Sequence, residues 1–164
     1  MPKFIENDTT LLADYIIAAG KGLFLFDGRP GAGKSYLART MAGRLGGTFV
    51  DGDDFLASGQ GMFVGALKVD DLRRAVETAN TQAVLLATVC ARLVAGRLGL
   101  PIASVIWVEQ ASAIRLAQIS RDYFDYDENA DFGRRHPLYK EVEAYIAAVD
   151  ARRSPDVVYL NAFE

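Results

Sequence analysis

The sequence predicts an α/β fold in which a parallel sheet of about five strands lies between two layers of helices. Two observations indicate this fold. Short, almost wholly apolar runs recur along the chain, as expected of strands that are buried on both faces. Longer segments with helical spacing separate these runs, and strands that alternate with helices form parallel sheets covered on both sides. The length, 164 residues, suits a single domain that spans residues 1–164.

The helical segments carry recognisable start and stop signals. Asn7 or Asp8 can cap the first helix and Gly20 can end it. The helix that begins near residue 69 has an acidic first turn, which suits the helix dipole, and the last helix begins at Pro137. The predicted helices span residues 7–20, 34–46, 69–80, 89–99, 111–124 and 137–153.

The predicted strands are short and apolar. The most apolar part of the chain, residues 83–108, is interrupted by Arg92, Arg97 and Pro101, so it indicates strand, helix and strand rather than a membrane span. The predicted strands span residues 22–26, 47–51, 83–88, 103–109 and 156–160.

Composition narrows the classes of partner and compartment. The net charge of −3 argues against nonspecific binding of nucleic acid, which needs a basic surface. The single cysteine, Cys90, allows no internal disulfide and suits a reducing compartment. No apolar segment follows a basic start at the N-terminus, so no signal peptide is predicted. We therefore expect a soluble cytoplasmic protein with no membrane partner, whose oligomeric state the sequence does not predict.

The stretch "GRPGAGKS", residues 28–35, fits the phosphate-binding pattern G-x-x-x-x-G-K-[ST] between a predicted strand and a predicted helix. Glycines let successive backbone N–H groups point at phosphate oxygens, and the start of a helix adds the positive end of its dipole. Lys34 would reach the β- and γ-phosphates of ATP, and the Ser35 hydroxyl would bind Mg²⁺. The expected nucleotide contacts are Gly28, Arg29, Pro30, Gly31, Ala32, Gly33, Lys34, Ser35 and Tyr36.

Three acids, Asp51, Asp53 and Asp54, follow the second predicted strand of the sheet. Ligands of open parallel sheets bind at the carboxyl ends of the strands, so these acids would share an edge with the phosphate loop. We expect them to bind a substrate, and Asp51 to join Ser35 in holding Mg²⁺. A solvent-exposed turn is the alternative, because aspartate is common in turns.

"FDGRPGAGKS" followed by "TFVDGDDF" resembles the P-loop small-molecule kinases, which include uridine kinase-like, gluconate kinase-like and adenylylsulfate kinase-like proteins. The resemblance implies a three-layer P-loop NTPase fold and transfer of phosphate from ATP to a hydroxyl of a small metabolite or nucleoside. It also implies that an acid after the second strand of such a sheet binds the acceptor hydroxyl or accepts its proton. Asp53 is the first candidate for this catalytic role and Asp51 is the second.

The segment "IRLAQISRD", residues 114–122, is similar to the lid helix of uridine kinase-like proteins, and a lid is expected within residues 111–136. The resemblance implies that Arg121 stabilises the transferred phosphoryl group, although Gln118 stands where an arginine is usual. A surface helix held by salt bridges is the alternative. Arg134 would contact the substrate phosphate from the polar segment that follows, or would only be a solvated charge.

The third predicted strand departs from the family pattern. Kinases of this kind often end it with an acid and a glycine, whereas this chain has Ala87 and Thr88. One carboxylate on the metal side is then missing, and Asp51 or Asp53 can substitute for it. Two functions therefore stay open, an active small-molecule kinase and a catalytically weakened ATP-binding module that serves a partner. Modification of a protein is a third, which no feature of the sequence favours.

Overall fold

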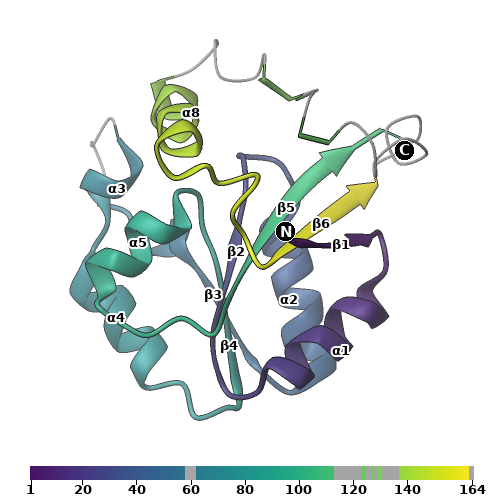
Figure 1. Cartoon of the computed structure of the whole chain (residues 1–164). Helices are drawn as coiled ribbons and strands as arrows, with labels where there is room; N and C mark the ends of the chain where they lie inside the picture. Colours follow the sequence, from purple (N-terminus) through teal and green to yellow (C-terminus); the bar gives the residue numbers. More distant parts are fainter. Residues whose placement is uncertain (58–61, 113–122, 125–126, 128, 131–136, 163–164) are drawn as a thin grey trace.

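In the computed structural model of the protein, a parallel sheet lies at the centre (Figure 1). The structure describes residues 1–57, 62–112, 123–124, 127, 129–130 and 137–162. Within these residues the strands are β1 (Lys3–Glu6), β2 (Gly22–Asp27), β3 (Thr48–Asp51), β4 (Ala83–Ala87), β5 (Ser104–Ala111) and β6 (Val157–Ala162). They form one sheet in the order β1-β6-β5-β2-β4-β3, and every pair of neighbours is parallel.

Helices cover both faces of this sheet (Figure 1). The described helices are α1 (Thr9–Ala19), α2 (Lys34–Leu45), α3 (Phe63–Ala66), α4 (Val69–Glu77), α5 (Ala91–Leu98) and α8 (Pro137–Val149), and a short 3₁₀ turn, η1, spans Gly52–Phe55. One apolar core lies between the sheet and α1 and α2, and the other lies between the sheet and α4, α5 and α8. None of the described helices is long and apolar enough to cross a membrane.

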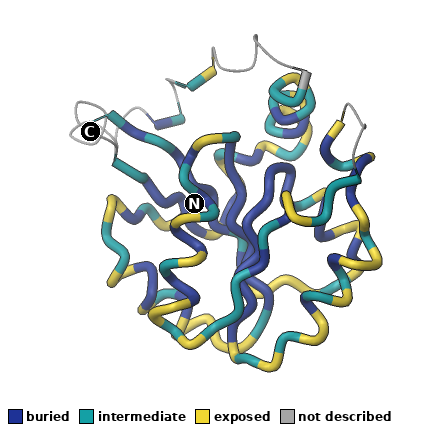
Figure 2. The backbone as a smooth tube through the Cα atoms, turned by 180° about the vertical axis from the view of Figure 1, so that it is seen from behind, coloured by how far each residue is buried: buried dark blue, intermediate teal, exposed yellow. Residues whose placement is uncertain are grey.

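Strand β2 lies in the middle of the sheet, between β4 and β5. Its side chains alternate between the two cores, with Phe24 and Phe26 on the α1 and α2 side and Leu23 and Leu25 on the other. The strands form the buried centre of the molecule, as Figure 2 shows. The chain leaves β2 toward β3 on one side, whereas β5 lies on the other. The loop after β2 is therefore at the point where the strand order reverses, which is where open α/β sheets bind their ligands.

The predicted fold class is confirmed, but the predicted number of strands is wrong, because six are present among the described residues and not five. The strand missed is β1, which is only four residues long and pairs with β6 alone at the edge of the sheet. Of its residues only Ile5 is fully buried, so no continuous apolar run marks it.

Several predicted helix boundaries also differ from the structure, and two of them have a cause in the backbone or the sheet. The last helix ends at Val149 rather than at residue 153, because Asp150 takes a left-handed backbone conformation with a φ of 52°. Strand β5 continues to Ala111, where a helix was predicted to begin. The rest of that predicted helix falls almost entirely on residues 113–122, outside the described residues.

Candidate functional site

The phosphate-binding motif forms the loop between the end of β2 and the start of α2, as the sequence predicts. Gly28 has a φ of 154°, and a Cβ atom there would lie 2.5 Å from the backbone oxygen of Val108. Gly33 has a φ of 90°, and a Cβ atom there would collide with the side chain of Asn161. Both positions therefore require glycine. Gly33 also has no side chain with which to cap α2, which leaves the N-terminus of the helix suited to an anion.

Lys34, the first residue of α2, is held in place by the loop itself. Its Nζ atom donates a hydrogen bond of 2.8 Å to the backbone oxygen of Arg29, and only 8% of the residue is exposed. Burial lowers the pKa of this ammonium group, whereas the nearby charges of Asp27, Asp53 and Asp51 oppose that shift. Lys34 is thus a positioned cation at the wall of a cavity.

The carboxylate of Asp27 lies directly behind the phosphate loop and is 1% exposed. Its Oδ1 atom accepts hydrogen bonds from the backbone N–H of Gly28, at 2.9 Å, and of Ala91, at 3.3 Å. Its Oδ2 atom accepts from the hydroxyl of Tyr145 on α8. Burial raises the pKa of Asp27 in spite of these donors. The residue joins the phosphate loop to α5 and α8, a role that its position at the end of an apolar run did not predict.

We expect Asp27→Asn to raise stability at neutral pH. Because the pKa of Asp27 is raised above its ordinary 3.8 in the folded state, the wild-type protein loses stability as the pH rises above that value. Asparagine keeps Oδ1 for the two backbone donors, and its amide can donate to Tyr145. Urea unfolding at pH 4 and pH 8 should give similar stabilities at pH 4 and a more stable variant at pH 8. A variant that is less stable at pH 8 would contradict this account.

Asp51 reaches the phosphate loop from the end of β3. Its Oδ2 atom accepts a hydrogen bond of 2.9 Å from the Ser35 hydroxyl. Asp51 is the register partner of Ala87 on β4, so the two side chains point to the same face of the sheet. Strand β3 lies one strand further from β2 than β4 does. The Asp51 carboxylate therefore approaches Ser35 from further away than an acid at position 87 of β4 would.

One cavity of about 340 Å³ lies beside the phosphate loop. Asp51 and Asp53 are the acidic residues among its described lining. Asp53 and Asp54 are both exposed, and Asp54 lies outside the lining. Partial burial raises the pKa of Asp53, and the charge of Asp51 adds to this shift. The described lining consists of Pro30, Gly31, Gly33, Lys34, Ser35, Tyr36, Asp51, Asp53, Phe63, Ala87, Thr88, Val89 and Leu138.

Helices α3 and α8 also contribute to the wall of the cavity. Phe63 of α3 and Leu138 of α8 line it. Glu141 of α8 fixes α3 in place, because its carboxylate accepts from the backbone N–H groups of Phe63, at 2.6 Å, and Val64, at 3.0 Å. Neither helix α3 nor the role of Glu141 is predicted by the sequence pattern.

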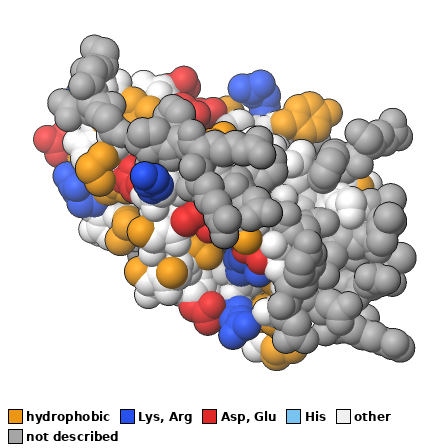
Figure 3. All heavy atoms as spheres, turned by 90° about the horizontal axis from the view of Figure 1, so that it is seen from above, with side chains coloured by type: hydrophobic (Ala, Val, Ile, Leu, Met, Phe, Trp, Pro, Cys, Tyr) orange, Lys and Arg blue, Asp and Glu red, His pale blue; other side chains and the backbone are white. Residues whose placement is uncertain are grey.

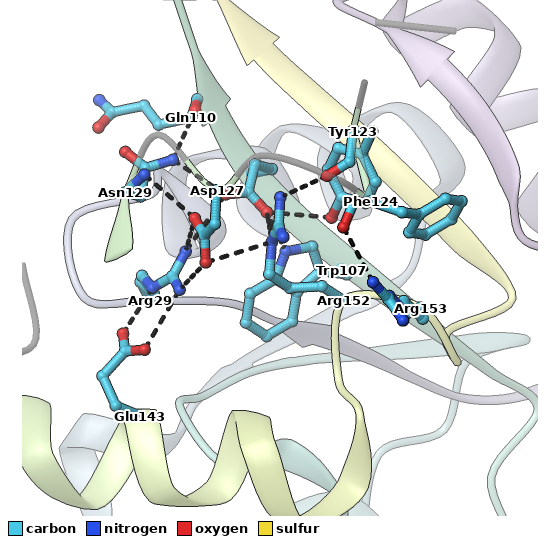
Figure 4. A network of polar contacts seen from close by, with 11 residues as sticks. Arg29, Trp107, Gln110, Tyr123, Phe124, Asp127, Asn129, Glu143, Arg152 and Arg153 are labelled. Atoms are coloured by element: carbon cyan, nitrogen blue, oxygen red, sulfur yellow. Dashed lines mark hydrogen bonds and ion pairs between the residues drawn. The ribbon is translucent and has the colours of Figure 1, made fainter. Parts of the chain in front are cut away.

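The remaining predicted site residues differ in their placement. Tyr36 lines the cavity and is 76% exposed. The side chain of Arg29 is buried, and its guanidinium contacts carboxylates from outside the loop rather than lining the cavity (Figure 4). If Arg29 binds a nucleotide, it therefore does so through its backbone. Arg121 and Arg134 lie outside the described residues, so their predicted roles stay predictions.

Charges of both signs occur together on the face seen from above in Figure 3, where Lys and Arg side chains lie among Asp and Glu side chains. The described part of this face therefore has no broad basic field of the kind that attracts a nucleic-acid backbone. The expectation that nucleic acid is not a partner stays a prediction.

The sheet order and the loop at its centre define a P-loop kinase-like fold. The chain is similar in structure to a possible uridine kinase from Bacillus stearothermophilus, with a TM-score of 0.56 over 92% of this chain and 96% of that one. The two sequences are 14% identical, so the similarity shows the fold alone. The sequence matches no protein-family model and no curated protein.

Proposed function

We propose that this chain is an ATP- and Mg²⁺-dependent phosphotransferase that acts on a hydroxyl of a small metabolite or nucleoside in the cytoplasm. One observation carries the proposal: a single cavity joins the phosphate loop to Asp51 and Asp53. Pockets that combine an apolar wall with a few convergent polar groups are the usual binding sites of small molecules. The P-loop kinase-like fold supports the same reaction class.

The phosphate loop and Lys34 would hold the β- and γ-phosphates of ATP. Ser35 and Asp51 would hold Mg²⁺, which keeps few protein ligands besides the phosphates and would neutralise their charge. The hydrogen bond of 2.9 Å between Ser35 and Asp51 holds two oxygen donors together, and oxygen is the ligand that Mg²⁺ prefers.

Asp53 would bind the acceptor hydroxyl and take its proton. The acceptor oxygen then forms a bond to the γ-phosphorus while the bond from that phosphorus to the bridging oxygen of ADP breaks, and the proton remains on Asp53. Phe63 and Leu138 would exclude water from the reacting groups. Arg121 and Arg134 are proposed to steady the transferred group.

Release of ADP with a panel of neutral sugars, nucleosides and hydroxy acids tests this function. We expect at least one acceptor to stimulate release strongly, and we expect EDTA to abolish the stimulation. The Lys34→Ala variant serves as the negative control for contaminating kinases. Tight binding of ATP without stimulation by any acceptor of these classes would count against phosphoryl transfer.

A catalytically weakened ATP-binding module is the second candidate, because β4 ends at Ala87, Thr88 follows it, and neither position carries an acid. Under this hypothesis Ala87→Glu should raise turnover, since position 87 points to the same face as Asp51. Ala87 is 1% exposed, so the unfolding temperature of the variant must be measured in parallel. No gain in a folded variant would leave this hypothesis without support.

The Asp51→Asn variant tests the proposed metal site. We expect the Mg²⁺ concentration required for half-maximal ATP binding to rise by about tenfold, because a carboxylate that supports a metal site contributes about ten- to a hundredfold to its affinity. Calorimetric titrations of ATP at several Mg²⁺ concentrations measure the change. Asp14→Asn, on the exposed side of α1, is the matched control. An unchanged Mg²⁺ requirement would remove Asp51 from the metal site.

A further inference from the structure

The side chain of Arg29 forms five hydrogen bonds beside the phosphate loop (Figure 4), and only 6% of the residue is exposed. It pairs with Glu143 of α8 through Nε at 2.7 Å and Nη2 at 3.3 Å. It pairs with Asp127 through Nη1 at 3.0 Å and Nη2 at 2.6 Å. Nη1 also lies 3.3 Å from Glu109 of β5. These contacts use all five N–H groups of the guanidinium.

Glu109, which accepts from Nη1 of Arg29, extends this network to further residues. Its Oε2 atom accepts from Trp107 at 2.6 Å, from the Tyr123 hydroxyl at 3.0 Å and from Nε of Arg152 at 3.1 Å. Its Oε1 atom accepts from the amide of Asn129 at 2.9 Å. The loop, β5, α8 and the segment that contains Tyr123, Asp127 and Asn129 are thus joined by one set of polar contacts.

This network leaves Arg29 unavailable to a phosphate. Among the described residues, two guanidinium groups, from Arg29 and Arg152, pair with the three carboxylates of Glu109, Asp127 and Glu143. The carboxylates accordingly hold the pKa of Arg29 above its usual value, although burial opposes that shift. A buried ionic network is weak evidence for stability, because the cost of removing charges from water offsets their attraction.

The backbone of Arg29 contacts a residue that lines the candidate ligand site, because its carbonyl oxygen accepts the hydrogen bond from Nζ of Lys34 at 2.8 Å. One residue therefore fixes the orientation of the phosphate-binding lysine at its backbone and is itself fixed at its side chain by three other parts of the chain. Movement of the loop around a bound triphosphate would be transmitted directly to the carboxylates that hold Arg29.

We propose that Arg29 is a positioning residue, whose ion pairs fix the carbonyl that orients Lys34 and couple triphosphate binding to Tyr123, Asp127 and Asn129. The proposal rests on one part of the proposed function, the binding of MgATP at the phosphate loop, and needs no phosphoryl transfer. Binding at the loop then stabilises a segment that contributes no described residue to the cavity.

The Arg29→Lys variant keeps the charge but loses the planar five-donor geometry, so it tests the network without removing a cation. We expect the Kd for MgATP to rise about tenfold, the size of effect typical of groups that orient a binding side chain. In the wild type, MgATP should slow amide hydrogen exchange in a peptide that covers residues 123–130. In the variant this slowing should be lost.

Arg73→Lys is the matched control, because Arg73 also binds a carboxylate, that of Asp70, and the carbonyl of Leu98, but on helix α4 away from the loop. It should bind MgATP as the wild type does and show the same slowing. Asp127→Asn is a second test that keeps an acceptor oxygen and removes one charge. It should weaken MgATP binding and reduce the slowing of amide exchange, as Arg29→Lys does. If Arg29→Lys does not fold, Asp127→Asn tests the proposal in its place.

A folded Arg29→Lys variant with a lower unfolding temperature, but with wild-type MgATP affinity and wild-type slowing of exchange, would make Arg29 purely structural and overturn the proposal. Failure of the wild-type protein itself to bind MgATP would overturn both this inference and the proposed function. Binding of MgATP by the wild type without acceptor-stimulated turnover would refute only the phosphotransferase assignment, and the coupling experiment would still decide the role of Arg29.

Discussion

Replacement of Lys34 by alanine is expected to weaken MgATP binding by about a hundredfold or more while the protein stays folded. The ammonium group is buried and its Nζ atom is already fixed on the carbonyl of Arg29, so it would meet a phosphate with little loss of conformational freedom. Charge-assisted hydrogen bonds to such a group are about twice as strong as neutral ones. Isothermal calorimetry with MgATP measures the loss.

Stability of this variant needs a separate measurement, because Lys34 also compensates the charge of buried Asp27. Lys34→Met fills the space of the side chain without its charge, and it should show the same loss of affinity if the fold tolerates alanine poorly. Lys21→Ala, in the exposed turn between α1 and β2, is the matched control. Normal MgATP binding by a folded Lys34→Ala protein would mean that this loop does not bind phosphate.

The phosphate loop could be predicted because its chemistry is local. Gly28, Gly33, Lys34 and Ser35 lie within eight consecutive residues, and each has a reason that requires no knowledge of the rest of the fold. To predict that Asp51 lies near Ser35 requires one further rule, that the carboxyl ends of parallel strands lie at the same edge of the sheet. The structure places Oγ of Ser35 and Oδ2 of Asp51 2.9 Å apart, so a carboxylate reaches Ser35 although β4 ends in Ala87.

The contacts of α8 with the loop could not be predicted in the same way. Tyr145 meets Asp27 across 118 residues of sequence, and Glu143 meets Arg29 across 114. These pairs depend on how α8 lies over the ends of the strands, which its own amphipathic pattern does not specify. Arg29 also lies inside a phosphate-binding motif, where a cation is naturally assigned to the ligand. Only the positions of its partner carboxylates show that its side chain binds elsewhere.

Asp53→Asn is expected to reduce kcat by about a hundred- to ten-thousandfold, the range typical of the loss of a general base, and to change the affinity for MgATP by less than about twofold. An amide can still accept a hydrogen bond from the acceptor hydroxyl, but it cannot take the proton. Asp14→Asn, far from the cavity on α1, is the control. Loss of activity in Asp54→Asn, but not in Asp53→Asn, would move the role of base to the neighbouring acid.

The pH dependence of kcat gives a sharper test than its magnitude. A general base works only when it is deprotonated, so activity should fall as the pH drops through the pKa of Asp53. Partial burial and the charge of Asp51 both raise the pKa of Asp53 in the metal-free protein, so a titration without Mg²⁺ should show Asp53 binding its proton at a higher pH than an ordinary aspartate does. In the metal-free protein, Asp51→Asn should move this titration of Asp53 to lower pH, because it removes one of the charges that raise the pKa. The residual activity of Asp53→Asn should lack this fall altogether. If the fall in activity persists unchanged in Asp53→Asn, the fall is caused by the titration of another group. Asp53 would then bind the acceptor without taking its proton.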